Sequence, residues 1–314
     1  MITESKGGGW ALKAYVTIFI LYMLIPLVVM GGAALNDSRF PSIYPWAGFT
    51  THWFVELFND QRIWLATLNT FIVAIAVVSL SVPIGTAAAI LINSLQGRLR
   101  TILYGVMVAP LLTPGAVIGI STLLFWYGIH LPALELREVA TGTAANLGSF
   151  SVLWTWITGG VPAGSEVAFA WASVPAGLPL SVLGQTSFVS AFVMLLVLAR
   201  LQSFDRGLEE AALDLGASYW QVIRRVLLPH LYPAIGAAAV IAFFQSVENF
   251  NTTLFTKGSS DTLTVYVFSK VRSGITPTIN ALALILIGIT IVAALWYEIS
   301  RRRKDRMEAL AGKA

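Results

Sequence analysis

Two uninterrupted apolar stretches, residues 14–35 and 67–92, constrain the fold of this chain more than any other feature. A helix needs about 20 mostly apolar residues to cross the hydrocarbon core of a bilayer, and both stretches reach that length. Over the whole chain, 56% of the residues are hydrophobic and 11% are charged, whereas a soluble domain carries about 25% charged residues. We therefore expect an all-α integral membrane protein.

Four further apolar stretches bring the expected number of membrane spans to six. They cover residues 102–127, 184–201, 234–255 and 278–297. The span at 14–35 is longer than the apolar region of a signal peptide, so an uncleaved helix is favoured over a cleaved leader. Pro110 and Pro114 predict a kink in the third span, either beside a translocation path or as a structural bend in a packed bundle.

The segments that connect the spans differ in composition. Residues 36–66 are rich in aromatic side chains, which favour the membrane–water interface. Residues 131–183 mix Gly, Pro and Trp with apolar runs too short to cross a bilayer. We expect an extracytoplasmic insertion there with interfacial or re-entrant helices, the alternative being a pair of further spans. Residues 257–277 are expected to form an external loop.

The distribution of basic residues predicts the orientation of the spans. Of the 20 Lys and Arg residues, 14 fall on the side that holds both termini and six on the other. Basic residues favour the cytoplasmic side, so both termini should be cytoplasmic. The expected division is an N-terminal segment 1–13, a transmembrane permease domain 14–298 and a basic tail 299–314 that contacts anionic lipid head groups.

A polar stretch, residues 202–233, separates the fourth and fifth spans. Asp205 is placed to cap a short helix whose first turn holds Glu209 and Glu210, where carboxylates suit the helix dipole. Gly216 is expected to end that helix, because glycine adopts positive φ easily. Ser218 and Gln221 have the spacing of a capping box for a second helix. Pro229 and Pro233 are expected to end the second helix.

This stretch resembles the cytoplasmic coupling loop of ABC importer permeases, in which E-A-A precedes a glycine and a later L-P. The matching residues are Glu210, Ala211, Ala212, Gly216, Val226, Leu228 and Pro229. Val226 departs from the family, which usually has Ile there. The resemblance implies a six-helix type I permease fold in the bacterial inner membrane. It also implies separate ATPase subunits that bind ATP, a second related permease subunit and an extracytoplasmic solute-binding protein.

Two external segments resemble those of spermidine and putrescine permeases. One begins at N-D-S-R-F, residues 36–40, and the other runs from Leu263 to Leu282. In the second, Thr264 and Phe268 replace a proline and a tyrosine that are usual in the family. The resemblance implies import of polyamines or a related small organic cation. The alternatives are an ABC importer permease for another small solute or an ion-coupled secondary transporter, which would show inverted repeats.

Glu248 is the one carboxylate well inside an expected span. Fifteen residues beyond Pro233 place it about 22 Å along a helix, in the outer half of the membrane. Such a group should face protein or water, and polar residues follow it: Asn249, Asn251 and Thr252. We expect these residues to line a substrate pathway that attracts ammonium groups. The alternative is a protonated Glu248 that is hydrogen-bonded across a subunit interface.

Several functions are disfavoured by the residue types present. The chain has no cysteine, and its three histidines lack the spacing of a metal site. It has no P-loop motif, so ATP should bind to the partner subunits and the chain itself should hold no cofactor. The basic residues flank apolar spans rather than forming a stripe with aromatic residues, which argues against nucleic-acid binding. A single intramembrane carboxylate argues against a membrane enzyme.

Overall fold

The computed structural model describes residues 8–126, 176–274 and 276–311. Within those ranges the regular secondary structure is helical, with no strand, so the predicted all-α class is confirmed. Four of the described helices are long and apolar enough to cross a membrane, or five if one bent pair is a single span. The chain forms two compact units, one of Met1–Ile63 with Val267–Ala314 and one of Trp64–Tyr266.

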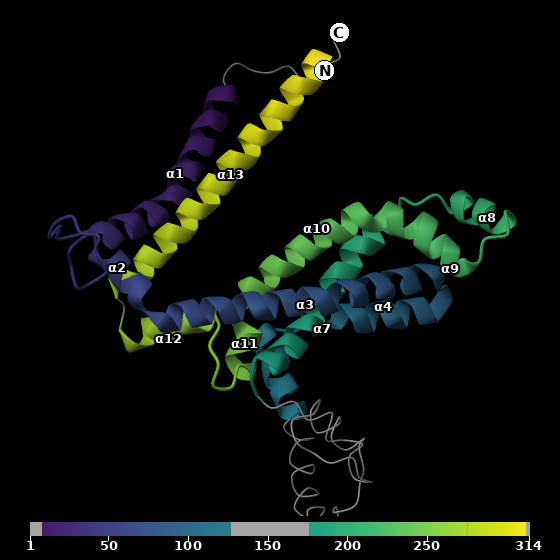
Figure 1. Ribbon diagram of the computed structural model, residues 1–314, viewed down its shortest axis with the longest axis horizontal. Helices are drawn as coiled ribbons and strands as arrows, with labels where there is room; N and C mark the ends of the chain where they lie inside the picture. Colours follow the sequence, from purple (N-terminus) through teal and green to yellow (C-terminus); the bar gives the residue numbers. More distant parts are fainter. Residues whose placement is uncertain (1–7, 127–175, 275, 312–314) are drawn as a thin grey trace, which may run out of the picture. The chain divides into compact units, whose positions relative to one another are not determined.

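The first unit pairs the two ends of the chain. Helix α1 (Gly8–Leu35) packs along α13 (Pro277–Ala311), and the short α2 (His52–Asn59) also contacts α13 (Figure 1). A Cβ added at Gly31 would lie 3.4 Å from Leu284 Cδ1, so the two long helices approach closely there. Helix α13 continues beyond the expected sixth span into the basic tail.

A buried asparagine organises the aromatic loop after α1. Asn36 is fully buried, and its Oδ1 accepts from the Ala47 N–H at 2.8 Å. Its Nδ2 donates to the carbonyls of Ser42 at 2.8 Å and Pro45 at 3.1 Å. The Trp53 Nε1–H donates to the Asn36 carbonyl at 2.9 Å. The loop therefore satisfies its own polar groups while presenting aromatic rings outward.

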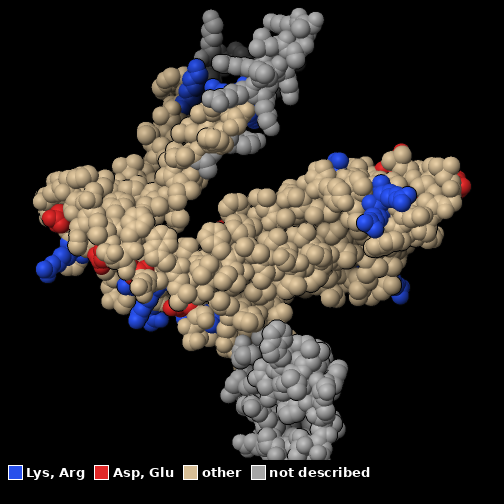
Figure 2. Space-filling model, viewed as in Figure 1, with Lys and Arg blue, Asp and Glu red and all other residues tan. Residues whose placement is uncertain are grey.

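Helix α7 (Leu178–Leu201) forms the centre of the second unit, against α4 (Gly97–Leu112) and α10 (Leu228–Val247). Its Val189, Val193 and Met194 are inaccessible to solvent. A Cβ at Gly85, on α3 (Gln61–Ser94), would lie 2.6 Å from the Ser190 carbonyl oxygen, so glycine permits backbone contact between α3 and α7. On the face drawn in Figure 2, the charged residues of this unit gather toward its ends, with an uncharged band between them.

The third expected span is broken rather than gently kinked. Helix α4 ends at Leu112, and a second helix, Gly115–Trp126, leaves it at an angle of 105°. The predicted interruption lies at Pro114, whereas Pro110 is accommodated inside α4.

Helix α7 begins at Leu178, earlier than expected. Residues 178–183 therefore belong to this helix, and the predicted end of the insertion at residue 183 was wrong. Pro179 in its first turn suits a helix start. Most of the insertion, residues 131–175, lies outside the described residues.

The expectation that Pro229 and Pro233 end a helix is wrong. Helix α9 (Tyr219–Val222) passes through a π turn, η2 (Ile223–Leu227), directly into α10. The Leu228 N–H bonds the Ile223 carbonyl five residues back. Pro229 lacks an N–H and crowds the carbonyl four residues before it, so the wider turn lets the helix continue past the proline.

The helix instead breaks farther along, inside the expected fifth span 234–255. Helix α10 ends at Val247, and α11 (Asn251–Thr256) follows after three residues. A single helix across this span was therefore a wrong prediction. The Asn249 side chain competes with helical pairing, because its Oδ1 accepts from the Thr253 N–H at 3.2 Å. The expected external loop 257–277 also contains a helix, α12 (Leu263–Ser273).

A glutamine on α7 braces this break. Gln185 is 1% exposed, and its Nε2 donates to Thr253 Oγ1 at 2.8 Å. Its Oε1 accepts from Ser246 Oγ at 2.5 Å. One side chain therefore bonds the last turn of α10 and the first turn of α11. We call Gln185, Ser246 and Thr253 the glutamine brace.

Replacing Gln185 with Leu should lower the free energy of unfolding, because both brace bonds are lost while Ser246 and Thr253 stay buried. Side-chain hydrogen bonds between membrane helices contribute about 0.6–1.7 kcal/mol each, so the expected loss is about 1–3 kcal/mol. Denaturant unfolding of the protein in lipid micelles measures it. The matched control is Thr186→Val, because the buried Thr186 hydroxyl donates only within α7, to the Val182 carbonyl. Equal losses of unfolding free energy in the two variants would contradict a stabilising role for the glutamine brace.

Candidate functional site

A cavity of about 490 Å³ opens in the second unit beside both helix breaks. Its walls come from the end of α4 and the turn after it, from α7, and from the junction between α10 and α11. The lining residues are Pro110, Leu111, Thr113, Gly115, Ile118, Phe188, Phe192, Gln245, Glu248, Asn249, Phe250 and Asn251. Backbone that leaves helical geometry at membrane depth is tolerated where it lines such a cavity.

Glu248 is the charged residue of this lining, and its side chain is exposed to the cavity. It follows the last residue of α10, and its N–H donates to the Phe244 carbonyl at 3.0 Å. Across the described residues, no Lys, Arg or His nitrogen lies within 4.0 Å of its carboxylate. The negative end of the α10 dipole adds to the negative potential there. The site can therefore attract a cation.

The other lining residues suit an organic cation. Asn251 and Gln245 supply amide oxygens, whereas the Asn249 Oδ1 already accepts two hydrogen bonds from Thr253. The rings of Phe188 and Phe192 are four residues apart on α7 and so face the same side of that helix. Aromatic faces attract ammonium groups through cation–π interactions.

The four predicted pathway residues divide into two groups in the structure. Glu248, Asn249 and Asn251 line the cavity, whereas Thr252 is fully buried outside the lining. Asn249 also contacts the first turn of α11, because its Oδ1 accepts from the Thr253 hydroxyl at 3.1 Å. Thr252 Oγ1 donates to the Gly115 carbonyl at 3.1 Å and so bonds α11 to the start of the helix Gly115–Trp126.

Glycines allow the two broken segments to meet around Thr252. A Cβ at Gly119 would lie 2.8 Å from the Thr252 carbonyl oxygen, and one at Gly184 would lie 2.9 Å from Thr252 Cγ2. Side chains at either position would separate the helices. Gln185, Phe188 and Phe192 were not predicted as site residues. The spacing of the two phenylalanines is visible in the sequence, but nothing local marks Gln185.

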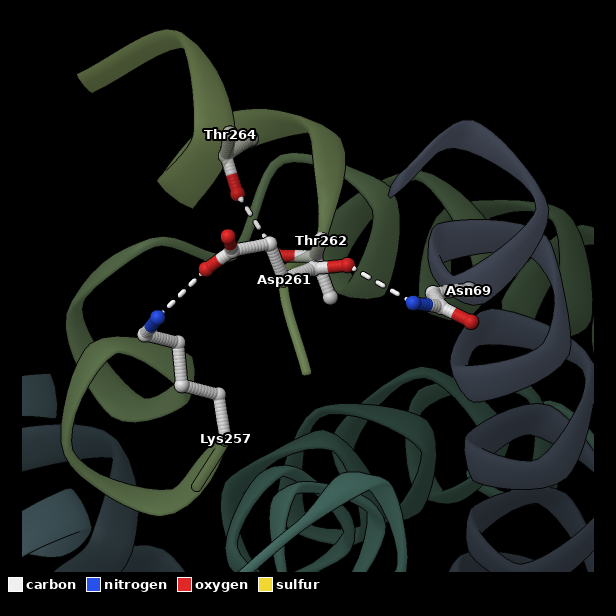
Figure 3. Close-up of polar contacts among 5 residues, drawn as sticks. All are labelled: Asn69, Lys257, Asp261, Thr262 and Thr264. Carbon is white, nitrogen blue, oxygen red and sulfur yellow. Dashed lines mark hydrogen bonds and ion pairs between the residues drawn. The ribbon is translucent and has the colours of Figure 1, made fainter. Parts of the chain in front are cut away.

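The loop after α11 is held by its own polar contacts (Figure 3). Lys257 pairs with Asp261, and the Asp261 carbonyl accepts from Asn69 Nδ2 of α3 at 2.9 Å. Thr262 and Thr264 share a hydroxyl contact at 3.3 Å, and Thr264 Oγ1 also donates to the Asn249 carbonyl at 3.2 Å. The charge of Lys257 is thus neutralised within its loop rather than by Glu248.

The second candidate site is a pair of short helices between α7 and α10. Asp205 accepts from the Gly207 N–H at 2.9 Å and caps α8 (Arg206–Asp214), as predicted. Gly216 has φ +84°, and its N–H donates to the Leu213 carbonyl at 2.8 Å, while the Ala217 N–H donates to Ala212 at 3.1 Å. This paired bonding is a Schellman motif, which ends a helix. The predicted glycine bend is confirmed.

The second short helix, α9, begins with the predicted capping box. Ser218 Oγ accepts from the Gln221 N–H at 3.4 Å, and Gln221 Oε1 accepts from the Ser218 N–H at 2.8 Å. Among the seven motif residues, Glu210, Ala211, Gly216 and Pro229 are exposed, whereas Ala212, Val226 and Leu228 are half-buried.

Four large apolar side chains of these helices are exposed. Their exposed fractions are 54% for Leu208, 89% for Leu215, 72% for Tyr219 and 67% for Trp220. Glu209, Glu210 and Asp214 of α8 accompany them, and Figure 2 shows acidic side chains at the end of the unit that carries α8. Clustered exposed apolar side chains rimmed by charge are typical of a protein–protein contact surface. We call α8 and α9 the helical hairpin.

Comparison with known proteins identifies the family of the chain. Residues 81–306 match the family described as binding-protein-dependent transport system inner membrane component. The chain is 26% identical over 307 residues to the spermidine/putrescine transport system permease protein PotC of Escherichia coli K12, covering 98% of this chain and 97% of PotC. It is 28% identical over 291 residues to the putrescine transport system permease protein PotI of the same strain, covering 91% and 89%.

The fold is also shared with a solved structure. A bacterial ABC transporter involved in the import of the acidic polysaccharide alginate contains a chain that matches with a TM-score of 0.60 and 20% identity, over 93% of this chain and 96% of that one. Within the described residues, no group of three or more His, Asp or Glu side chains could hold a metal ion. The chain belongs to the family of binding-protein-dependent transport system inner membrane components and is a multi-pass permease subunit of an ABC importer.

Proposed function

We propose that this permease imports polyamines or a related small organic cation. The observation that carries the proposal is the carboxylate of Glu248, which has no ion-pair partner among the described residues, in a cavity whose lining also holds amide side chains and phenylalanine rings. Extended polyamines carry several ammonium groups joined by methylene chains, so they suit a site that alternates acceptors with apolar surface. The spermidine and putrescine permeases among the relatives support the same solute class.

We propose further that the helical hairpin, within residues 202–233, is the cytoplasmic surface that docks onto an ATPase subunit. Its exposed Leu215 and Trp220 provide apolar contact area, and Glu210 is exposed on α8. The distribution of basic residues supports a cytoplasmic hairpin and cytoplasmic termini. ATP would bind to that ATPase, while a second related permease and an extracytoplasmic solute-binding protein complete the importer.

The connection between the two sites supports a coupled mechanism. Helix α7 runs from the cavity residues Phe188 and Phe192 to the start of the hairpin, and α10 returns from the hairpin to Glu248. A displacement of the hairpin would therefore reach the cavity through two helices that pack together. Alternating access then requires these helices to move with the ATPase, opening the cavity first to one side and then to the other.

Another small solute is the second candidate, because a chain of the alginate importer shares the fold. An acidic polysaccharide would meet repulsion from Glu248 in this cavity, where no described basic residue contributes to the lining. The electrostatics of the cavity therefore favour a cationic cargo over a polyanion.

Replacing Glu248 with Gln should raise the concentration of spermidine needed for half-maximal uptake. Loss of a charged hydrogen bond to ammonium costs about 1.5 kcal/mol at a solvated site, which corresponds to about tenfold. Uptake into cells that lack other polyamine importers measures the effect. Glu248→Asp, which keeps the charge, should recover most of the affinity. Unchanged rate and affinity in Glu248→Gln would remove Glu248 from the pathway.

Replacing Gly216 with Val should uncouple the permease from its ATPase. A β-branched residue at φ +84° strains the bend and reorients the hairpin. Co-purification of the ATPase and spermidine uptake should each fall about tenfold, consistent with a strain of about 1–2 kcal/mol.

Gly97 offers a matched control for this variant. It also has positive φ, at +68°, with open space around its Cβ position, but lies outside the hairpin. Gly97→Val should introduce similar strain and leave ATPase co-purification nearly unchanged. Equal loss of the ATPase in both variants would show that strain alone, not hairpin geometry, produces the effect.

A further inference from the structure

A second cavity lies farther along two helices that also line the first. It measures about 370 Å³ and sits between the beginning of α4 and the end of α7. Its lining residues are Arg100, Thr101, Tyr104, Leu195, Leu198, Ala199 and Gln202. None of them belongs to the lining of the cavity around Glu248. We call this second cavity the basal groove.

We propose that the basal groove binds one anionic phospholipid, with its phosphate at Arg100 and the upper part of an acyl chain over Leu195 and Leu198. Basic pockets between membrane helices are suited to acidic lipid head groups.

The positive charge at the groove favours an anionic ligand. In the described structure, no carboxylate oxygen lies within 4.0 Å of the Arg100 guanidinium. Arg200 follows the lining residue Ala199 on α7, and the carboxylate of Asp205 already caps α8. Thr101 and Gln202 add hydrogen-bond donors beside Arg100. A phosphate would therefore meet both positive charge and neutral donors.

The apolar floor distinguishes a lipid from free phosphate. Leu198 is 5% exposed at the base of the groove, and Tyr104 is 40% exposed beside it. Free phosphate would use Arg100 and leave this surface in contact with water. The groove also lies where α4 begins, at Gly97, and α7 ends, at Leu201. Helix ends that carry Arg and Tyr are typical of the head-group level of a membrane.

The absence of cysteine from the chain allows one fluorescent label to be placed in the groove. The variant Ala199→Cys, labelled with bimane and reconstituted with its partner subunits, would be measured in phosphatidylcholine vesicles. These would contain a minor fraction of either acyl-brominated phosphatidylglycerol or acyl-brominated phosphatidylcholine. A single arginine near the membrane surface favours the anionic lipid by about fivefold. Half-maximal quenching should therefore need about one-fifth as much brominated phosphatidylglycerol as brominated phosphatidylcholine.

Matched variants separate a defined site from general attraction to the surface. Adding Arg100→Gln should abolish the preference for phosphatidylglycerol, whereas Arg98→Gln, outside the groove lining, should retain it. Equal quenching by both lipids, or equal effects of the two arginine variants, would overturn the proposal. Quenching by neither lipid would also overturn it and would mean that another chain covers the groove. None of these readouts depends on which solute is transported.

Discussion

Backbone polar groups freed inside a membrane must find partners within the protein, and this requirement shapes the site of the permease. Two helices break close to one another, after Leu112 and after Val247. At the first break the Thr113 hydroxyl donates to the Ala109 carbonyl, and at the second the Asn249 Oδ1 accepts from the Thr253 N–H. The Thr252 hydroxyl bonds the Gly115 carbonyl and so joins the two broken segments. Gly119 and Gly184 lie against Thr252 and let the broken segments approach each other closely. Without these partners, the exposed backbone would be too costly to place beside a cavity in the bilayer.

The breaks give the cavity its chemistry. A continuous helix would bury its carbonyls and carry Glu248 on its side, whereas the break places the carboxylate at a negative helix end facing open space. Helices α7 and α10 then lead from this point to the two ends of the hairpin, and Gln185 joins them near the cavity. The π turn at Ile223–Leu227 lies where α10 departs from the hairpin. One packed helix pair thus connects the surface proposed to bind ATPase with the site proposed to bind solute.

Local signals in the sequence predicted the hairpin well. Asp205, Gly216 and the pair Ser218 and Gln221 act through bonds that span at most a few residues, so spacing alone identifies them. Long-range contacts were not predictable in this way. Nothing in the sequence shows that Gln185 reaches Thr253, 68 residues away, or that Thr252 is buried against glycines. The prediction that Pro229 ends a helix was wrong because a π turn accommodates a proline that a regular α-helix excludes. The six-span count stays a prediction, since α13 has a shorter apolar part, Pro277–Val292.

The central claim is that the cavity at the two breaks lies on a transport path that the ATPase opens alternately to each side. Alkylation of a single cysteine at Asn251, in importer reconstituted with one known orientation, tests it most directly. We expect a membrane-impermeant maleimide to reach this cysteine from one side without nucleotide and from the other with a non-hydrolysable ATP analogue. Labelling from neither side, or labelling from the same side with and without the nucleotide, would contradict alternating access at this cavity.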